Sequence, residues 1–355
     1  MRKHVLVFIV LNFFVCESWS QNQEIGYLAG LLESGNFVKL KVECERNISA
    51  SPKNRAAHYY LGIVFYETNE FRQAVEHLDL ACKLKPDADV YYRLALAYGS
   101  LAETVNTLKQ PFVINDMVNA LEKALSFDTN HNEAKFLLAK FYTSAPSFLG
   151  GDLEKAKKYS NELMSVRPEY ANLVKGYIFM KEENASSAED YFLKALEINP
   201  SLDDAYDKLN TLCSTKGNFS TYLIKLTSLH PFSPCPFYYL ALTQMDNQQY
   251  SEASRNFLRA ISNDPEFMPA YYQAGKLSVI SHTGYEIGIR YLNKYLSKPV
   301  GKRNIIPSHA DAHWRLGMIY EELKNKNEAI SHYELAISLD PDHDAAKQAL
   351  KKISN

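Results

Sequence analysis

Small, apolar and aromatic residues recur at fixed offsets along the chain, and short polar stretches separate them. The clearest example runs from His313 to Pro341, where one stripe of such residues precedes the polar stretch Lys324 to Asn327 and a second stripe follows it. The two stripes consist of Leu316, Gly317 and Tyr320, and then of Ala329, Tyr333 and Ala336. Residues three or four apart share one face of an α-helix, so each stripe predicts one helix. Gly317 and Ala329 have minimal side chains that let two backbones approach closely. The stretch therefore predicts a packed helical hairpin.

The same order of residues recurs over most of the chain after residue 24. Comparable stretches run from His58 to Pro86, from Gly176 to Pro200 and from Phe237 to Pro265. Prolines, which cannot continue a helix, end the copies: Pro52, Pro86, Pro168, Pro200, Pro231, Pro265, Pro299 and Pro341. This order of small, aromatic and proline positions resembles the tetratricopeptide repeat (TPR), a helical hairpin of about 34 residues. The resemblance implies an all-α solenoid of about eight to nine repeats over residues 21–355, with residues 342–353 as a C-terminal capping helix.

Two of the first three copies depart from the regular pattern. Residues 24–52 predict a degenerate first repeat, because the first helix is short and terminal repeats are often atypical. In the copy that follows Pro86, an insertion at residues 103–116 contains Pro111. It predicts an extended first helix, a break and a short apolar tuck before a second helix resumes at Met117.

Two further insertions follow. Residues 144–152 contain Gly150 and Gly151, which predict a sharp turn, and Asp152, which suits a helix N-cap. Residues 300–306 predict an extra loop. The insertions at residues 103–116 and 144–152 lie on adjacent repeats. Together they resemble an arrangement in exported bacterial TPR proteins, a prolonged hairpin followed by a Gly-Gly turn. The periplasmic TPR partners of some solute transporters have a similar turn.

Residues 1–20 predict a cleaved secretory signal peptide rather than a folded segment. Its basic start, apolar run and cleavage site are Arg2 to His4, Val5 to Val15 and Ser18 to Ser20. We therefore expect cleavage near Ser20, a mature chain that begins at Gln21, and an extracytoplasmic location, periplasmic or secreted. The alternative is a lipid-modified Cys16, although large residues precede it.

Charge and chemistry narrow the classes of function. Lys and Arg number 39 against 41 Asp and Glu, so there is no basic excess to bind nucleic acid. His309 and His313 are four apart and could share a helix face as metal ligands, but no third ligand is evident. Residues 340–344 imitate the start of a calcium loop but lack its later glycine and glutamate. We expect no enzyme activity, no metal and no cofactor.

The cysteines and asparagines leave two questions open. The mature chain keeps an even number of cysteines, which permits disulfides, but their helical positions favour buried thiols: Cys44, Cys82, Cys213 and Cys235. Three asparagines start Asn-x-Ser sequons that are glycosylation acceptors in hosts with that machinery: Asn47, Asn184 and Asn218.

A row of aromatic residues is the candidate binding site. The TPR resemblance places the fifth position of each repeat in the concave groove, where six copies carry a ring: Tyr59, Tyr92, Phe136, Tyr238, Tyr272 and Trp314. Such a row could bind an extended peptide or a partner helix. It could equally serve packing between repeats. The TPR groove that clamps a C-terminal carboxylate is not expected, because Tyr59 and Ile63 replace two of its residues.

Two functions follow from these patterns. The first is an exported, non-enzymatic scaffold that mediates protein–protein interaction through its concave groove. The alternative is a periplasmic accessory protein that binds a small hydrophobic solute for envelope transport, in a pocket between residues 103–116 and the groove. A large closed pocket near Phe112 and Phe148 favours the solute, and an open aromatic channel favours the protein partner.

Overall fold

The computed structural model describes residues 23–214, 217–297 and 307–354. Within those ranges the chain forms helices and turns and no strand, so the predicted all-α fold is confirmed there. Four predictions concern residues outside these ranges and stay predictions. They are the signal peptide at residues 1–20, the cleavage near Ser20, the alternative lipid site at Cys16 and the insertion at residues 300–306.

The chain divides into two compact units, the first ending at Tyr159 and the second beginning at Ser160. Unit 1 contains helical residues 23–33, α2 (Phe37–Ala50), α3 (Arg55–Glu67), α4 (Phe71–Leu84), α5 (Ala88–Thr104), α6 (Gln110–Phe127), α7 (Asn132–Ser144) and the short η1 (Ser147–Leu149). The division falls within α8 (Leu153–Leu163).

Unit 2 continues with α9 (Pro168–Lys181), α10 (Ala185–Ile198), α11 (Asp203–Cys213), α12 (Phe219–Leu229), α13 (Pro234–Asp246), α14 (Tyr250–Asn263), α15 (Met268–Ile280), α16 (Tyr285–Leu296), α17 (His309–Glu322), α18 (Lys326–Leu339) and α19 (Asp344–Ser354). None of the described helices is both long and apolar enough to cross a membrane.

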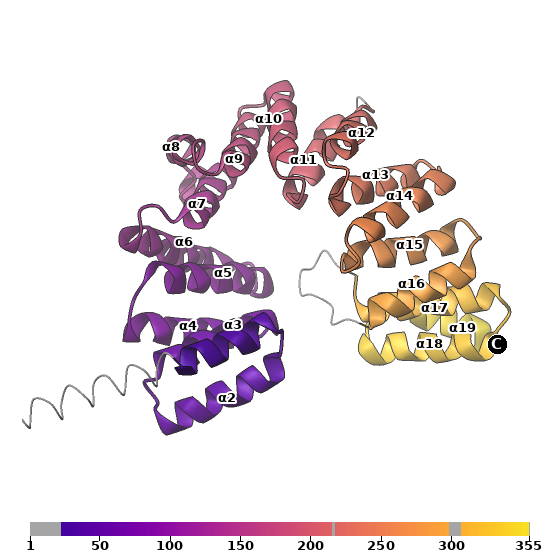
Figure 1. Cartoon of the computed structure of the whole chain (residues 1–355), viewed down its shortest axis with the longest axis horizontal. Helices are drawn as coiled ribbons and strands as arrows, with labels where there is room; N and C mark the ends of the chain where they lie inside the picture. Colours follow the sequence, from indigo (N-terminus) through magenta and orange to yellow (C-terminus); the bar gives the residue numbers. More distant parts are fainter. Residues whose placement is uncertain (1–22, 215–216, 298–306, 355) are drawn as a thin grey trace, which may run out of the picture. The chain divides into compact units, whose positions relative to one another are not determined.

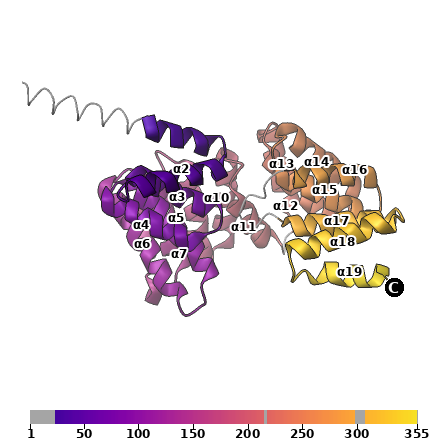
Figure 2. The same cartoon turned by 90° about the horizontal axis from the view of Figure 1, so that it is seen from below.

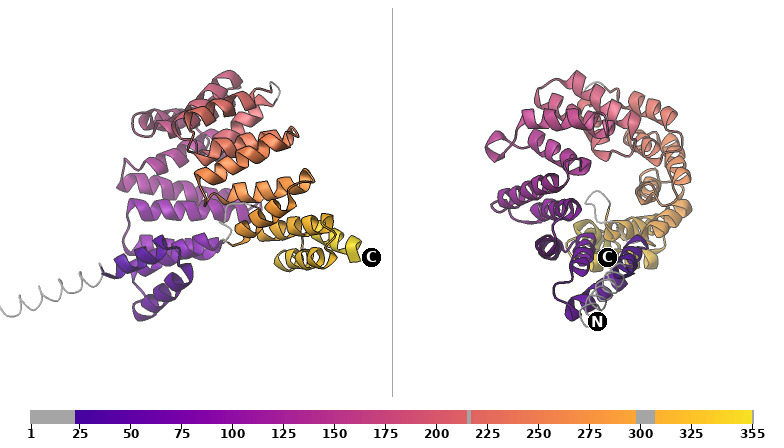
Figure 3. Two further views of the ribbon diagram at one scale, coloured as in Figure 1. Left: turned by 45° about the vertical axis from the view of Figure 1, so that its right-hand side comes forward. Right: turned by 60° about the vertical axis from the view of Figure 1, so that its left-hand side comes forward.

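Among the described helices, six pairs of consecutive helices pack closely as hairpins: α3/α4, α5/α6, α9/α10, α13/α14, α15/α16 and α17/α18. In unit 2, for example, α13 packs on α14, α14 on α15, α15 on α16, and α16 on α17 (Figure 1). The first helices of neighbouring hairpins also meet, since α15 packs against both α13 and α17. Figure 2 shows the last hairpin and α19 side by side at the C-terminal end of unit 2. The left view of Figure 3 shows the successive hairpins from the side.

Glycines at the helix crossings explain how closely the hairpins pack. A Cβ at Gly317 would lie 2.4 Å from the Tyr333 ring of the facing helix, well inside contact distance. The same holds at Gly62, Gly176 and Gly275, where a Cβ would meet the facing side chain within 2.5 to 2.6 Å. Any larger residue at these positions would push the two helices apart. The crossing positions predicted from the repeat pattern are therefore confirmed.

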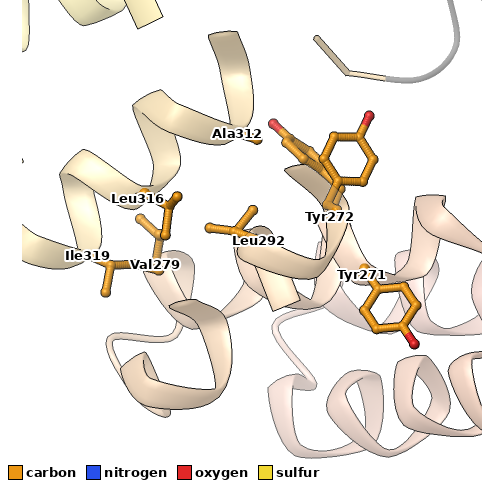
Figure 4. Close-up of a cluster of buried hydrophobic side chains, with 8 residues drawn as sticks. Tyr271, Tyr272, Val279, Leu292, Ala312, Leu316 and Ile319 are labelled. Carbon is orange, nitrogen blue, oxygen red and sulfur yellow. The ribbon is translucent and has the colours of Figure 1, made fainter. Parts of the chain in front are cut away.

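In unit 2 the core includes separate local clusters of buried side chains. One cluster joins two neighbouring hairpins, with Tyr271, Tyr272 and Val279 from α15, Leu292 from α16, and Ala312, Leu316 and Ile319 from α17 (Figure 4). Because each hairpin buries apolar surface mainly against its neighbours, the fold grows by adding hairpins.

The insertion at residues 103–116 lengthens a hairpin, and the predicted apolar tuck is wrong. Helix α5 has 17 residues and α6 has 18, against 13 and 14 in the preceding hairpin. Helix α6 starts at Gln110, not near Met117, and includes Pro111 in its first turn. Proline fits that turn because an N–H in the first turn has no helical carbonyl four residues earlier to bond. Phe112 consequently lies on the helix and is 74% exposed.

The turn between α7 and α8 is tight, as predicted, but only one of its two glycines has a left-handed backbone. Gly150 has φ +96°. The Gly151 N–H donates to the Pro146 carbonyl at 3.0 Å, and a Cβ at Gly151 would lie 1.9 Å from the Ala145 carbonyl oxygen. Asp152 caps α8 by accepting from the backbone N–H groups of Glu154 and Lys155, which confirms the predicted N-cap.

Candidate interaction face

The six ring residues of the predicted groove all lie on first helices of hairpins. Tyr59, Tyr92 and Phe136 belong to α3, α5 and α7 in unit 1, and Tyr238, Tyr272 and Trp314 belong to α13, α15 and α17 in unit 2. Each set of three lies within one unit. Tyr272 is only 4% exposed, and the other five are partly buried.

Several of these rings pack against the start of the next hairpin. The Tyr92 ring centroid lies 4.8 Å from that of His131, the residue before α7. Tyr238 packs on Phe267 at 5.3 Å, and Trp314 packs on His343 at 5.4 Å, each just before the next first helix. The rings therefore join consecutive repeats, which is the packing role that the sequence left open.

In unit 2 two of the ring hydroxyls are also used by the next hairpin. Gln273 of α15 acts on the Tyr238 hydroxyl, and Arg315 of α17 acts on the Tyr272 hydroxyl. Burial raises the pKa of Tyr238 to about 12, and the Gln273 side chain opposes that rise. Burial likewise raises the pKa of Tyr272, opposed by the Arg315 side chain. Both phenols are thus neutral at physiological pH.

The first helices α15 and α17 also contribute a cation each, Lys276 and Arg315. The Arg315 guanidinium stacks on the Trp314 ring at 4.0 Å, and its Nε is buried with no hydrogen-bond partner. Burial lowers the pKa of Lys276, the positive charge of Arg315 lowers it further, and the charge of Asp246 opposes the shift. Among the described residues no carboxylate forms an ion pair with either cation. We call the surface made by Tyr238, Gln273, Lys276, Trp314 and Arg315 the unit 2 first-helix face.

Unit 1 contains a pocket of about 760 Å³. Its lining comes mainly from α5, α6, α7 and the turn before α8, with Tyr66 of α3 and Lys155 of α8, so residues from both insertions form its walls. The residues that line it include Leu96, Gly99, Ile114, Met117 and Leu149. Phe112 and Phe148, the two rings expected beside a solute pocket, are outside the lining and are 74% and 84% exposed.

Family models described as tetratricopeptide repeat match residues 45–98, 169–202 and 310–343. The chain carries tetratricopeptide repeats. The matched segments include the α3/α4, α9/α10 and α17/α18 hairpins, whose crossing glycines are Gly62, Gly176 and Gly317. In these three hairpins the repeat pattern and the helices of the structure agree.

Solved TPR structures are similar to this chain at low identity. A thermophilic TPR protein from Thermus thermophilus is 15% identical, with 54% of this chain and 98% of that chain covered and a TM-score of 0.42. YrrB, a TPR protein with an unusual peptide-binding site, is 19% identical, with 55% and 100% covered and a TM-score of 0.42. A TPR protein from Parabacteroides merdae is 16% identical, with 95% and 99% covered and a TM-score of 0.37. No curated protein matches the sequence.

The TPR register also aligns two histidine pairs that sequence reasoning missed. His58 and His77 face each other across the α3/α4 hairpin, with their Nδ1 atoms 2.9 Å apart. His313 and His332 do the same across α17/α18 at 3.0 Å. In both hairpins the two histidines are 19 residues apart, a spacing that was visible in the sequence.

The two histidines of α17 whose spacing suits a metal, His309 and His313, contact different partners. His313 turns to His332, whereas the His309 ring lies 6.0 Å from that of Tyr295. In the described ranges no group of three or more His, Cys, Asp or Glu residues could hold a metal ion. In the stretch that imitates a calcium loop, Asp340 accepts from the Asp342 N–H, and His343 accepts from the Ala346 N–H.

The four described cysteines are buried thiols, as their helical positions favoured: Cys44, Cys82, Cys213 and Cys235. Burial is the main cause that raises the pKa of Cys44, Cys82 and Cys235 to about 12. Thiols with such pKa values carry almost no thiolate at neutral pH and are chemically inert while the fold is closed.

The sequon asparagines have structural contacts. Asn184 is exposed and caps α10 by accepting from the Ser187 N–H. The Asn47 amide donates to Glu24, and the Asn218 amide donates to the Tyr222 hydroxyl. Their glycosylation stays a prediction.

Proposed function

We propose that this protein is a non-enzymatic scaffold that binds an acidic segment of a partner protein on the unit 2 first-helix face. Tetratricopeptide repeats support a role in protein–protein interaction. The observation that carries this proposal is the Arg315 guanidinium, which stacks on Trp314 at 4.0 Å with its buried Nε unpartnered. Its charge lowers the pKa of Lys276, and neither cation forms an ion pair with a carboxylate among the described residues.

Placing two like charges together on a partly buried surface is unfavourable unless an anion joins them. Arg315 offers planar N–H donors that match a carboxylate, and Lys276 adds a point charge beside them. The stacked Trp314 ring supplies apolar area next to the charges. An acidic side chain followed by an apolar one therefore suits this face.

Two of the three rings in unit 2 stabilise the hairpins rather than contact a partner. Tyr272 is buried and Tyr238 packs among Tyr239, Phe257 and Phe267, so both rings support the hairpins. Removing them would unfold the face as well as change its surface. Trp314 is the ring on which partner contact would depend.

The solute-binding alternative has less support as the main function. It was tied to a closed pocket near Phe112 and Phe148, and both rings are exposed and outside the pocket lining. A role in envelope transport would need a further observation.

The test is a charge reversal with a matched control. Partners are captured with the wild-type protein, and their affinity is then measured for Lys276→Glu/Arg315→Glu and for Lys326→Glu/Lys351→Glu, which makes the same charge change on exposed residues of α18 and α19. We expect at least a tenfold loss for the first variant, about 1.4 kcal/mol, and little change for the control. Equal binding by both variants, with unchanged circular dichroism melting, would exclude this face.

We also propose that the protein is exported and begins at Gln21. The support is the basic start, the apolar run and the small residues before the expected cleavage site. N-terminal sequencing of the protein from its native source checks this, and a lipid-bearing Cys16 at the N-terminus would replace it with membrane anchoring.

A further inference from the structure

We propose that the unit 1 pocket is a binding site for a small, uncharged and mainly apolar molecule. The pocket lies within unit 1, and the proposed interaction face lies within unit 2. The inference therefore does not depend on the proposed function, and either can fail without the other.

The walls of the pocket are mainly apolar. Leu96 and Gly99 of α5 form one side, Ile114, Met117 and Val118 of α6 another, and Leu149 of the turn a third. A volume of about 760 Å³ falls in the range of small-molecule pockets, roughly 300 to 1,000 Å³. Moving apolar surface from water to such walls is favourable by about 25 cal/mol per Å². The pocket can therefore accept an apolar body of the size of a small organic ligand.

The charges on the pocket lining balance, which favours an uncharged ligand. They are two carboxylates and two amines: Glu103, Glu122, Lys140 and Lys155. Two of them are linked through Tyr142, whose hydroxyl donates to Glu122 at 3.0 Å and whose ring lies 4.9 Å from the Lys155 ammonium. A ligand with a net charge would lose its hydration without meeting an excess of the opposite sign. The amides of Asn115 and Asn119 on the lining can still bond a neutral polar end.

The wall formed by the turn is held in place before any ligand binds. Inside it the Gly151 N–H donates to Pro146, and behind it the Asp152 N–H donates to the Tyr142 carbonyl at 2.9 Å. The opposite wall exists because the extended α5/α6 hairpin contributes Glu103, Gln110 and Ile114. Both insertions thus contribute to one cavity, and a preformed cavity binds without the cost of ordering its walls.

The test uses two fluorescent probes that share one skeleton. N-phenyl-1-naphthylamine is neutral, and its sulfonated analogue anilinonaphthalene sulfonate carries a negative charge. Both are titrated into the full chain, into Ser100→Trp, which fills the pocket from α5, and into Ser126→Trp, a matched change at an exposed residue of α6 outside the lining. We expect the neutral probe to bind the wild type and Ser126→Trp alike, and to bind Ser100→Trp at least tenfold more weakly. We expect the sulfonated probe to bind the wild type more weakly than the neutral one.

Three results would overturn the proposal. They are no saturable binding of the neutral probe, equal neutral-probe affinity for the two tryptophan variants, and tighter binding of the sulfonated probe than of the neutral one. If Ser100→Trp melts early, Asn115→Trp takes its place, since Asn115 lines the pocket from an exposed position on α6. The same affinity comparison against Ser126→Trp then decides the outcome.

Discussion

Glycine meets two different physical demands in this chain. At Gly150 the backbone has a left-handed φ of +96°, which other residues rarely adopt. At Gly317 and Gly151 the φ is ordinary, and the demand is space, because a Cβ would collide with the Tyr333 ring or with the Ala145 carbonyl oxygen. The collision at Gly151 involves backbone, which cannot rotate aside as a side chain can.

We predict that Gly151→Ala destabilises unit 1 by about 1 to 3 kcal/mol, because the turn must open to admit the Cβ. The matched control is Gly30→Ala in the helical residues 23–33, where a Cβ meets nothing within 4 Å. Alanine there should be neutral or stabilise slightly. Urea unfolding of the two variants checks the difference, and equal midpoints would contradict the crowding argument.

Gly317→Trp should still damage unit 2 severely, because the facing Tyr333 ring is fully buried and cannot retreat. The loss in overpacked cores is about 1 to 3 kcal/mol or more. Thermal melting followed by circular dichroism measures it, with Gly26→Trp, where a Cβ meets nothing within 4 Å, as the control. A Gly317→Trp variant that melts like wild type would show that the helices do not cross at this glycine.

At the scale of the helix, periodicity located the regular hairpins but misplaced the start of α6. The apolar run Phe112 to Ile114 after a proline does not distinguish a loop tucked onto the surface from the first turn of a helix. Only the neighbouring helix decides it, because α6 packs against α5. Proline is tolerated at a helix start and unfavourable in a helix interior, and sequence spacing alone does not separate the two.

We predict that Pro111→Ala changes the free energy of unfolding by no more than about 0.5 kcal/mol, because Pro111 lies in the first turn of α6. Asn119→Pro, in the exposed middle of the same helix, should cost about 3 kcal/mol or more through a lost hydrogen bond and a clash with the preceding turn. Equilibrium denaturation of both variants checks the pair. A large effect of Pro111→Ala would restore the broken-helix interpretation.

The repeat pattern of the sequence predicted only part of the candidate site. The repeat register places Tyr238, Tyr272 and Trp314 on first helices, as expected. Gln273 and Arg315 act on tyrosines of the preceding repeat that are far from them in sequence, so only the packed structure reveals these interactions. The same packing stacks Arg315 on Trp314 and brings its charge to bear on Lys276.

At the scale of the whole molecule, each unit contains one pair of facing histidines. Two imidazoles joined Nδ1 to Nδ1 share a single N–H, so one ring must donate and the other accept. Protonation of the accepting imidazole removes the acceptor of this hydrogen bond and places a positive charge between the two helices. Burial, with the positive charge of the partner as a second cause, lowers the pKa of His77 and lowers that of His313 to about 4. Burial also lowers the pKa of His332, against the opposing charge of Glu328.

We predict that stability falls as pH drops from about 6.5, the ordinary histidine value, towards 4. The sign follows because these pKa values are lower in the folded than in the unfolded chain, so acid protonates the unfolded state first. Thermal melting at pH 7.0 and 4.5 measures the loss. His332→Phe removes the shared proton and keeps a ring against Tyr320, and it should show a smaller loss than wild type. An unchanged pH dependence would assign the acid sensitivity to carboxylates instead.

The buried cysteines allow the local opening of each unit to be measured separately. Cys44 and Cys82 lie in unit 1, and Cys213 and Cys235 lie in unit 2. A thiol reagent can modify them only when their helices separate, so the rate of modification under native conditions reports the local opening equilibrium. Peptide mapping after timed exposure to the reagent therefore yields two independent opening free energies from one unlabelled, unmutated protein.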